Sequence, residues 1–133
     1  MRYLLDTDIC VYIMKDRPLP VRARMAKLHK TEAGMSVVSY LELSYGAWKS
    51  VRREDNLKKI EELRELISVL PLDLDVAHHF GRIRADLERQ GTPIGSYDLM
   101  IAAHALSLDL TLVTNNTREF ARIEGLRLEN WAA

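Results

Sequence analysis

The sequence has a single cysteine, no long hydrophobic run and no excess of charge of either sign. Cys10 alone can form neither an internal disulfide nor a zinc site, which favours a reducing, cytoplasmic environment. No apolar stretch approaches the roughly 20 residues that cross a bilayer, and Asp6 interrupts the first apolar run, which argues against a signal peptide. We therefore expect no membrane partner. Lysine plus arginine and aspartate plus glutamate both number 19, so a nucleic-acid partner would need a local basic surface.

What the sequence does contain is the composition of a globular protein. Apolar residues make up 47% and charged residues 29% of the 133 positions, which argues against disorder. A chain of this length suits a single sizeable hydrophobic core. It contains no repeat, low-complexity tract or linker, and we expect one domain over residues 1–133.

Short apolar segments alternate along the chain with segments of helical periodicity. The predicted strands cover residues 2–6, 34–38, 110–114 and 126–131, and residues 69–73 form an edge strand or a connection because of Pro71. The predicted helices cover residues 8–15, 21–30, 40–50, 54–68, 76–90 and 97–108, with Ser39 and Ser96 as N-caps of two of them. This alternation predicts an α/β fold in which helices cover both faces of a parallel sheet.

The first predicted strand ends in an acid, within the segment YLLDTDICVYI at residues 3–13. A buried carboxylate without a partner is costly, so hydrophobic segments usually exclude it. In open parallel sheets, ligands bind just beyond the carboxyl ends of the strands. Asp6 closes its strand, and we expect its carboxylate to reach that crevice. Asp8, two residues later, has a structural alternative as the N-cap of the following helix.

Three further acids lie at the start of a helix or after a strand, namely Glu42, Asp98 and Glu119. Such positions allow side chains to project into one cleft together with Asp6. Glu42 and Asp98 occupy predicted first helical turns, where the helix dipole stabilises an acid by about 0.3–1 kcal/mol without any function. Glu119 has an alternative as a solvated surface acid.

Convergence of these four acids would have a large electrostatic cost. Ionised carboxylates about 4–7 Å apart repel by roughly 2–4 kcal/mol per pair at an effective dielectric constant of about 20. Several such pairs would rival the whole stability of a small domain, about 5–15 kcal/mol. The cluster must therefore take up protons or a multivalent cation, and an all-oxygen site suits Mg²⁺ or Mn²⁺. These ions activate water and bind phosphate oxygens, which favours phosphodiester hydrolysis.

Four segments contain these acids, namely LLDTDI, SVVSYLELSYG, PIGSYDLMIAAHAL and VTNNTREFARIEGLRLENW. In order and spacing they resemble the PIN-domain ribonucleases of the VapC type, which are the toxins of bacterial toxin–antitoxin pairs. The resemblance extends over residues 3–131. It implies a three-layer α/β/α sandwich with a central, mostly parallel sheet, and a Mg²⁺- or Mn²⁺-dependent endoribonuclease acting on RNA such as tRNA or rRNA. It also implies a cognate antitoxin and a homodimer.

The resemblance carries roles to individual residues. The family's four catalytic acids match Asp6, Glu42, Asp98 and Glu119. Asp6 and Asp98 would bind the metal directly, and the two glutamates would complete the site. The family's polar residues that orient the acids match Thr7 and Asn115.

Two positions depart from the family pattern. Asp8 stands where the family usually has Asn or Ser, so this chain carries a fifth acid, which either tightens metal binding or caps the helix. Glu119 stands where Asp is also common, and its longer side chain leaves direct ligation open.

RNA binding would require local positive charge opposite the phosphates. The candidates are Arg118, which neighbours Glu119, together with Lys49 and Arg52. Other basic residues have a solvated helix face as the alternative, namely Arg22, Arg24, Lys27, Lys30 and Arg53. Tyr40, Tyr45 and Trp48 are interpreted as core or interface aromatics rather than as base-stacking platforms.

Two other functions are compatible with parts of the sequence. The first is a phosphatase resembling the haloacid dehalogenases, in which Asp6 would be the nucleophile and Asp8 an acid/base. That chemistry also needs a lysine, a distal acid pair and a larger scaffold, none of which we can place. The second is a non-enzymatic RNA- or protein-binding domain with a decayed site, against which the presence of all four acids argues.

Overall fold

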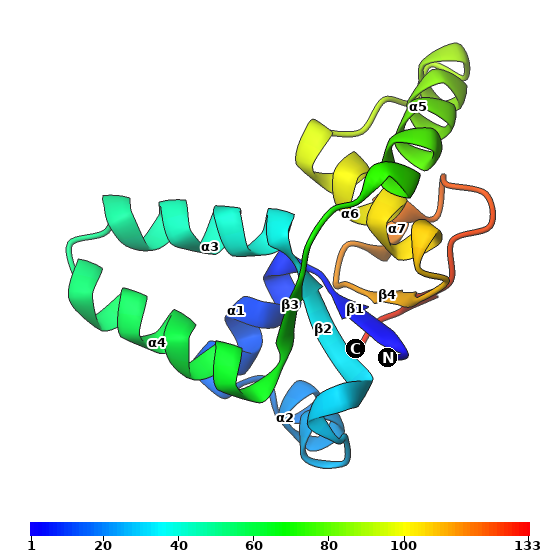
Figure 1. Cartoon of the computed structure of the whole chain (residues 1–133). Helices are drawn as coiled ribbons and strands as arrows, with labels where there is room; N and C mark the ends of the chain where they lie inside the picture. The colour runs from blue at the N-terminus through cyan, green and yellow to red at the C-terminus, as the bar shows by residue number, and fades with distance from the viewer.

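A five-stranded parallel sheet runs through the middle of the molecule (Figure 1). The computed structural model describes residues 1–133. The strands are β1 (Tyr3–Leu5), β2 (Ala33–Ser36), β3 (Ser68–Leu70), β4 (Thr111–Val113) and β5 (Leu128–Glu129). They lie in the order β3-β2-β1-β4-β5 and every neighbouring pair is parallel, which confirms the predicted fold class.

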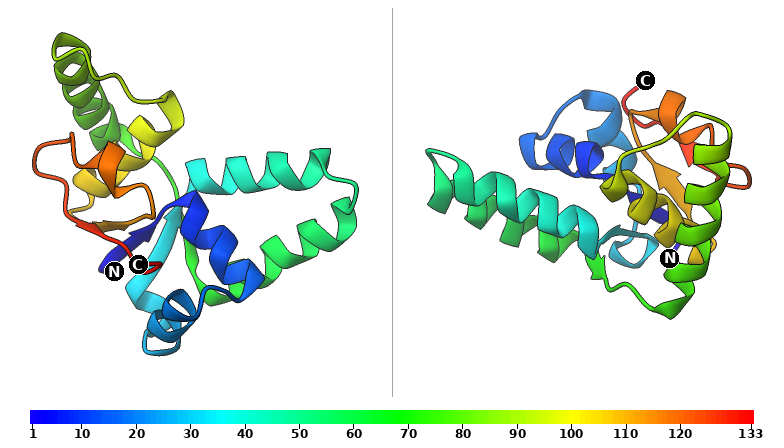
Figure 2. Two further views of the ribbon diagram at one scale, coloured as in Figure 1. Left: turned by 180° about the vertical axis from the view of Figure 1, so that it is seen from behind. Right: turned by 90° about the horizontal axis from the view of Figure 1, so that it is seen from above.

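Helices cover both faces of this sheet, so the molecule is a three-layer α/β/α sandwich (Figure 2). One layer contains α1 (Thr7–Lys15), α2 (Leu19–Ala26), the short 3₁₀ helix η1 (Lys30–Glu32), α3 (Val37–Lys49) and α4 (Arg53–Leu66). The other contains α5 (Leu74–Arg89), α6 (Ser96–Ser107) and α7 (Thr117–Phe120). No helix is both long enough and apolar enough to cross a membrane.

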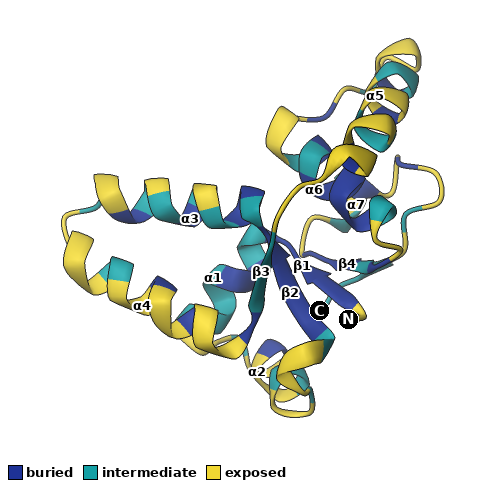
Figure 3. Cartoon of the chain, viewed as in Figure 1, coloured by how far each residue is buried: buried dark blue, intermediate teal, exposed yellow.

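The alternation of side chains along β1 explains why the sheet has a core on each face. Successive residues of a strand point to opposite faces. Tyr3 and Leu5 pack in the cluster that includes α1 and α4, whereas Leu4 packs in the cluster that includes α5 and α6. All three residues are buried, as the dark β1 ribbon in Figure 3 shows.

The order in which the chain adds strands to the sheet reverses direction at β1. β2 and β3 lie on one side of β1, while β4 and β5 lie on the other. The carboxyl end of β1 is therefore a topological switch point, where open α/β sheets form a crevice. Asp6 directly follows this strand end.

The helices α3 and α4 form an antiparallel hairpin that projects away from the sheet (Figure 1). We call this hairpin, residues 37–66, the α3–α4 arm. Only the start of α3 lies near α6 and the carboxyl end of β2. The arm therefore extends outward from the same edge of the sheet that carries Asp6.

The cap of the first helix differs from the prediction. Asp6, not Asp8, is the N-cap of α1, because its backbone is extended and its side chain accepts a hydrogen bond from the backbone N–H of Thr7. Asp8 lies in the first turn of α1 instead. The acid that closes the strand thus also begins the helix.

The caps of two later helices also lie earlier than predicted. Ser36, not Ser39, caps α3 by accepting a hydrogen bond from the Val38 N–H, so the predicted strand 34–38 ends at residue 36. Gly95, not Ser96, is the N-cap residue of α6. Val38 has the β-branched side chain typical of strands, but it packs against the core as part of the first turn of α3.

His104 joins α6 to the start of α3. Its Nδ1 atom lies 2.8 Å from Ser36 Oγ, and both side chains are buried. Burial lowers the pKa of His104, so the neutral imidazole is favoured. This contact fixes the helix that carries Asp98 relative to the helix that carries Glu42.

Two glycines provide a matched test of the packing. A Cβ atom on Gly34 would lie 3.0 Å from the backbone oxygen of Ser68 in the neighbouring strand, whereas one on Gly46 in α3 would meet no atom within 4 Å. We predict that Gly34→Ala lowers the free energy of unfolding by about 1–3 kcal/mol. Gly46→Ala should raise it by about 0.5–1 kcal/mol, because alanine is the better helix former. Urea denaturation measures both, and equal effects of the two substitutions would contradict the close β2–β3 packing.

Candidate active site

Asp6 is held at the switch point by hydrogen bonds to both of its carboxylate oxygens. Thr7 N donates to Oδ1 and Thr114 Oγ1 donates to Oδ2, each at 2.8 Å. The residue is only 5% exposed. Burial, and next the charge of Asp8, raise the pKa of Asp6 to about 6, although the two hydrogen bonds favour the ionised form.

Glu42 reaches the same edge from the second turn of α3. Thr7 Oγ1 donates a hydrogen bond to Glu42 Oε1 at 2.8 Å and lies 3.0 Å from Ser39 Oγ. The contact joins the start of α1 to α3. Thr7 was predicted to orient an acid, and its hydroxyl does contact one.

Asp98 and Glu119 approach from the other layer, in the first turns of α6 and α7. Burial raises the pKa of Asp98 to about 7, with further contributions from the charges of Asp6 and Glu119 and from a hydrogen bond to Glu119. Asn116 Nδ2 donates to Glu119 Oε2 at 2.8 Å. Two carboxyls within hydrogen-bonding reach favour a shared proton.

The structure thus brings all four predicted acids into one electrostatic cluster. The charge of Glu42 raises the pKa of both Asp6 and Asp98, and the charge of Asp6 raises that of Asp98. We call the four acids, together with Asp8, the acidic edge. As the side chains stand, no three of them surround a common point closely enough to hold an ion.

Asp8 is the fifth member of the acidic edge. Its Oδ2 accepts a hydrogen bond from the Asn115 backbone N–H at 3.1 Å, whereas its buried Oδ1 has no hydrogen-bond partner. Burial raises its pKa. A buried carboxylate oxygen without a donor, beside four other carboxylates, is an arrangement that fits an oxygen-binding cation such as Mg²⁺.

Asn115 contacts Asp8 rather than the four predicted acids. Besides its backbone N–H, its side-chain Nδ2 donates to Tyr12 Oη at 3.3 Å, and its Oδ1 accepts from Asn130 Nδ2 at 3.1 Å. These contacts connect the loop after β4 to α1 and to the segment after β5.

Sequence reasoning missed two residues that donate to the acids, Thr114 and Asn116, and a third, Ser39, that contacts Thr7. The sequence predicts Ser39 as a cap, whereas the structure buries it beside Thr7. The sequence predicts Thr114 as the last residue of a strand and Asn115, not Asn116, as an orienting residue. The available signal was position, because Thr114 and Asn116 directly follow a buried strand at the edge where Asp6 lies.

The predicted RNA-binding residues lie in two places. Arg118 is exposed on α7 next to Glu119, while Lys49 and Arg52 are exposed at the far end of the α3–α4 arm. Tyr45 and Trp48 are exposed on α3, so neither is a core aromatic, and their place in an interface stays a prediction. Tyr40 is half-buried.

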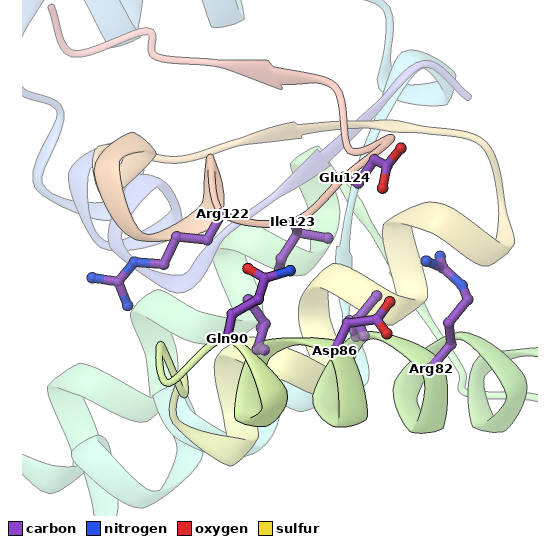
Figure 4. A pocket seen from close by; sticks show the side chains of 8 residues that line it. Arg82, Asp86, Gln90, Arg122, Ile123 and Glu124 are labelled. Atoms are coloured by element: carbon purple, nitrogen blue, oxygen red, sulfur yellow. The ribbon is translucent and has the colours of Figure 1, made fainter.

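The surface has one pocket away from the acidic edge and one groove that begins beside it. Figure 4 shows a small pocket between α5 and residues 122–124, lined by Arg82, Ile83, Asp86, Leu87, Gln90, Arg122, Ile123 and Glu124. It contains none of the acids of the acidic edge. A wider groove between α1, α3 and α4 begins at Thr7 and Glu42 and continues past Val11, Met14 and Leu43.

Comparison with known families identifies the class of protein. Residues 3–126 match the family model of the PIN domain. That match covers the sheet from β1 to β4 and all four predicted acids. The chain therefore belongs to the PIN-domain family, and its fold is that of this family.

Individual relatives narrow the assignment. The tRNA(fMet)-specific endonuclease VapC of Shigella flexneri is 48% identical over 99% of both chains, and the ribonuclease VapC2 of Haemophilus influenzae strain KW20 is 43% identical over 98% of both. The solved structure of DNA-bound VapBC from Salmonella typhimurium is similar with a TM-score of 0.92 and 44% identity over 98% of both chains. The chain belongs to the VapC ribonucleases of the PIN-domain family. This membership favours the nuclease prediction over the phosphatase alternative.

The burial of Asp6 and Asp98 beside other acids predicts how the metal-free protein responds to pH. The folded-state pKa values of Asp6 and Asp98, about 6 and about 7, lie above the ordinary 3.8. Between about pH 4 and pH 7 the folded chain therefore binds protons that the unfolded chain has released, and stability falls as pH rises through this window. We expect the melting temperature of the protein in EDTA to decrease over that range.

The substitution Asp98→Asn should weaken this pH dependence and raise the melting temperature at pH 8 by about 4 °C or more, which corresponds to about 1 kcal/mol. The control is Asp75→Asn, in the exposed first turn of α5. That change removes only a helix-dipole contribution of about 0.3–1 kcal/mol and should lower the melting temperature slightly. An unchanged pH profile in Asp98→Asn would show that Asp98 does not titrate with a raised pKa in the folded protein.

Proposed function

We propose that this chain is a divalent-metal-dependent endoribonuclease that hydrolyses RNA phosphodiester bonds at the acidic edge. The observation that carries the proposal is the gathering of Asp6, Glu42, Asp98 and Glu119 from four separate elements at one switch point. The raised pKa values of Asp6 and Asp98 reflect burial of these carboxyls and, next, the negative charge of the acids beside them. Such sites are a recognised sign of function.

In this proposal Asp6 and Asp98 bind Mg²⁺ or Mn²⁺ directly, and Glu42 and Glu119 complete the site. The donor set is all oxygen, which suits these ions, and the unpartnered Oδ1 of Asp8 supports the fit. A bound divalent cation supplies charge neutralisation to the phosphodiester and activation to the attacking water.

The chain's own residues hold the acids in place for this chemistry. Thr7 and Thr114 keep the Asp6 carboxylate at the carboxyl end of β1. Thr7 also orients Glu42, and Asn116 orients Glu119. Asn115 fixes Asp8 and the loop after β4. Positioned side chains of this kind reduce the reorganisation needed when substrate binds.

The relatives support a substrate and a partner for the chain. Two of them are named tRNA(fMet)-specific endonucleases, and we propose tRNA or another structured RNA as the substrate here. Solved relatives include VapBC toxin–antitoxin complexes. We therefore propose that this chain is the toxin of such a pair, a homodimer and one domain over residues 1–133, working in the cytoplasm with a cognate antitoxin. The groove that begins at Thr7 and Glu42 supports a partner lying beside the site.

The test is cleavage of RNA by protein purified free of any antitoxin. We expect wild-type protein to cut total RNA in Mg²⁺ or Mn²⁺ and to stop in EDTA. Asp6→Asn and Asp98→Asn should each lose 100-fold or more of the activity while remaining folded by circular dichroism, because each removes a proposed ligand. Asp75→Asn serves as the acidic control and should cut at the wild-type rate. Cleavage at that rate by either site variant would show that the site is misassigned.

A further inference from the structure

The outer surface of the α3–α4 arm exposes two aromatic side chains, each covered by a cation. Tyr45 is 66% exposed and Trp48 is 55% exposed. The Lys49 ammonium lies 5.0 Å from the centre of the Tyr45 ring, and the Arg53 guanidinium lies 5.0 Å from the centre of the Trp48 ring. A single exposed apolar side chain needs no explanation, but two exposed rings on one helix, each with a cation over it, form a local surface.

The helical spacing of α3 places Tyr45 and Lys49 on the same side of the helix as Glu42, which belongs to the acidic edge. Val38, Glu42, Tyr45 and Lys49 follow one another at helical spacing and form a single stripe along the helix. Val38 packs in the core cluster that contains α6, so the stripe lies on the side of α3 that faces α6. The rise of a helix places Tyr45 about 4.5 Å and Lys49 about 10 Å beyond Glu42 along the helix axis.

The cations at this end of the arm form no ion pair. Lys49, Arg52 and Arg53 outnumber the two acids nearby, Glu54 and Asp55, whereas Arg64 at the other end of α4 pairs with Glu61 at 3.1 Å. In a chain with 19 basic and 19 acidic residues, this local excess of positive charge provides a basic surface of the kind that an RNA partner requires.

We propose that Tyr45 and Lys49, continued by Trp48 and Arg53, form a surface that binds a single-stranded segment of the RNA and leads it to the acidic edge. This inference rests on the proposed ribonuclease function. Unpaired bases stack on exposed aromatic rings, and the adjacent cations contact the phosphates. The cations beside the two rings favour RNA, because phosphates require opposite charge. Tyr, Trp and Arg are also enriched in protein–protein interfaces, so a subunit interface is the competing outcome that the tests below distinguish.

The stacking contribution is tested by binding of a fluorescently labelled, single-stranded oligoribonucleotide of mixed sequence in EDTA, where cleavage is absent. Tyr45→Leu and Trp48→Ala should each weaken binding about 5- to 100-fold, the range expected for loss of one stacked base. Tyr45→Phe retains the ring and should bind within about twofold of wild type, while the apolar leucine should not. The control is Leu66→Ala, which removes a 54% exposed side chain from the opposite end of α4.

The charge contribution is tested by the salt dependence of the same binding. Lys49→Gln should reduce the slope of log affinity against log salt concentration by about 1. Lys27→Gln, at the exposed end of α2, should leave the slope unchanged. In cleavage of long RNA, the arm variants should raise KM with little change in kcat, because they remove binding but leave the acids intact.

Failure of this inference is distinguishable from failure of the proposed function. If wild-type protein cuts RNA but Tyr45→Leu and Trp48→Ala bind and cut as wild type does, the arm does not bind RNA. If both variants convert a dimer into a monomer by light scattering while RNA affinity stays at the wild-type value, the face is a subunit interface and the inference is overturned. If wild-type protein cuts no RNA with any divalent ion, the proposed function itself fails.

Discussion

The repulsion among carboxylates at the carboxyl end of β1 is the constraint on which the rest of the structure depends. Asp6 is buried there, and neighbouring acids come from helices in both outer layers. Burial, and next the charges of neighbouring acids, disfavour the fully ionised site, and the raised pKa values of Asp6 and Asp98 express that cost. Threonine and asparagine side chains hold the acids in place without neutralising them. The structure therefore maintains an excess of negative charge that a divalent cation can neutralise.

The fold around this edge holds its parts in register. The switch point brings the ends of β1 and β4 together, so Asp6 and Thr114 are neighbours although 108 residues apart. The buried contact between His104 and Ser36 joins the helix of Asp98 to the helix of Glu42. Beyond Glu42, α3 leaves the body of the protein and carries the exposed aromatic and basic side chains of the arm. One helix thus connects the acids to the surface that we propose for RNA.

Much of the fold, and the membership of the acidic cluster, could be predicted from the sequence because periodicity reports burial. The alternation of buried strands and amphipathic helices is visible in the residues, as is an acid at the end of LLD. Local features were harder to predict from the sequence. Val37 and Val38 have the side chains of a strand, yet they form the first turn of α3 because Ser36 caps it. The short elements η1 and α7 lack a full period, and the role of Thr114 depends on a contact across the sheet that no local pattern reports.

The claim that a cation replaces protons at the acidic edge can be measured directly by isothermal titration of Mn²⁺ into metal-free protein, in buffers of different ionisation enthalpy. Cation binding should be saturable and should release protons near pH 6, where Asp6 and Asp98 are partly protonated. The release should vanish at pH 9, where both are already ionised. Saturable binding without proton release at pH 6, or no binding at either pH, would contradict the account.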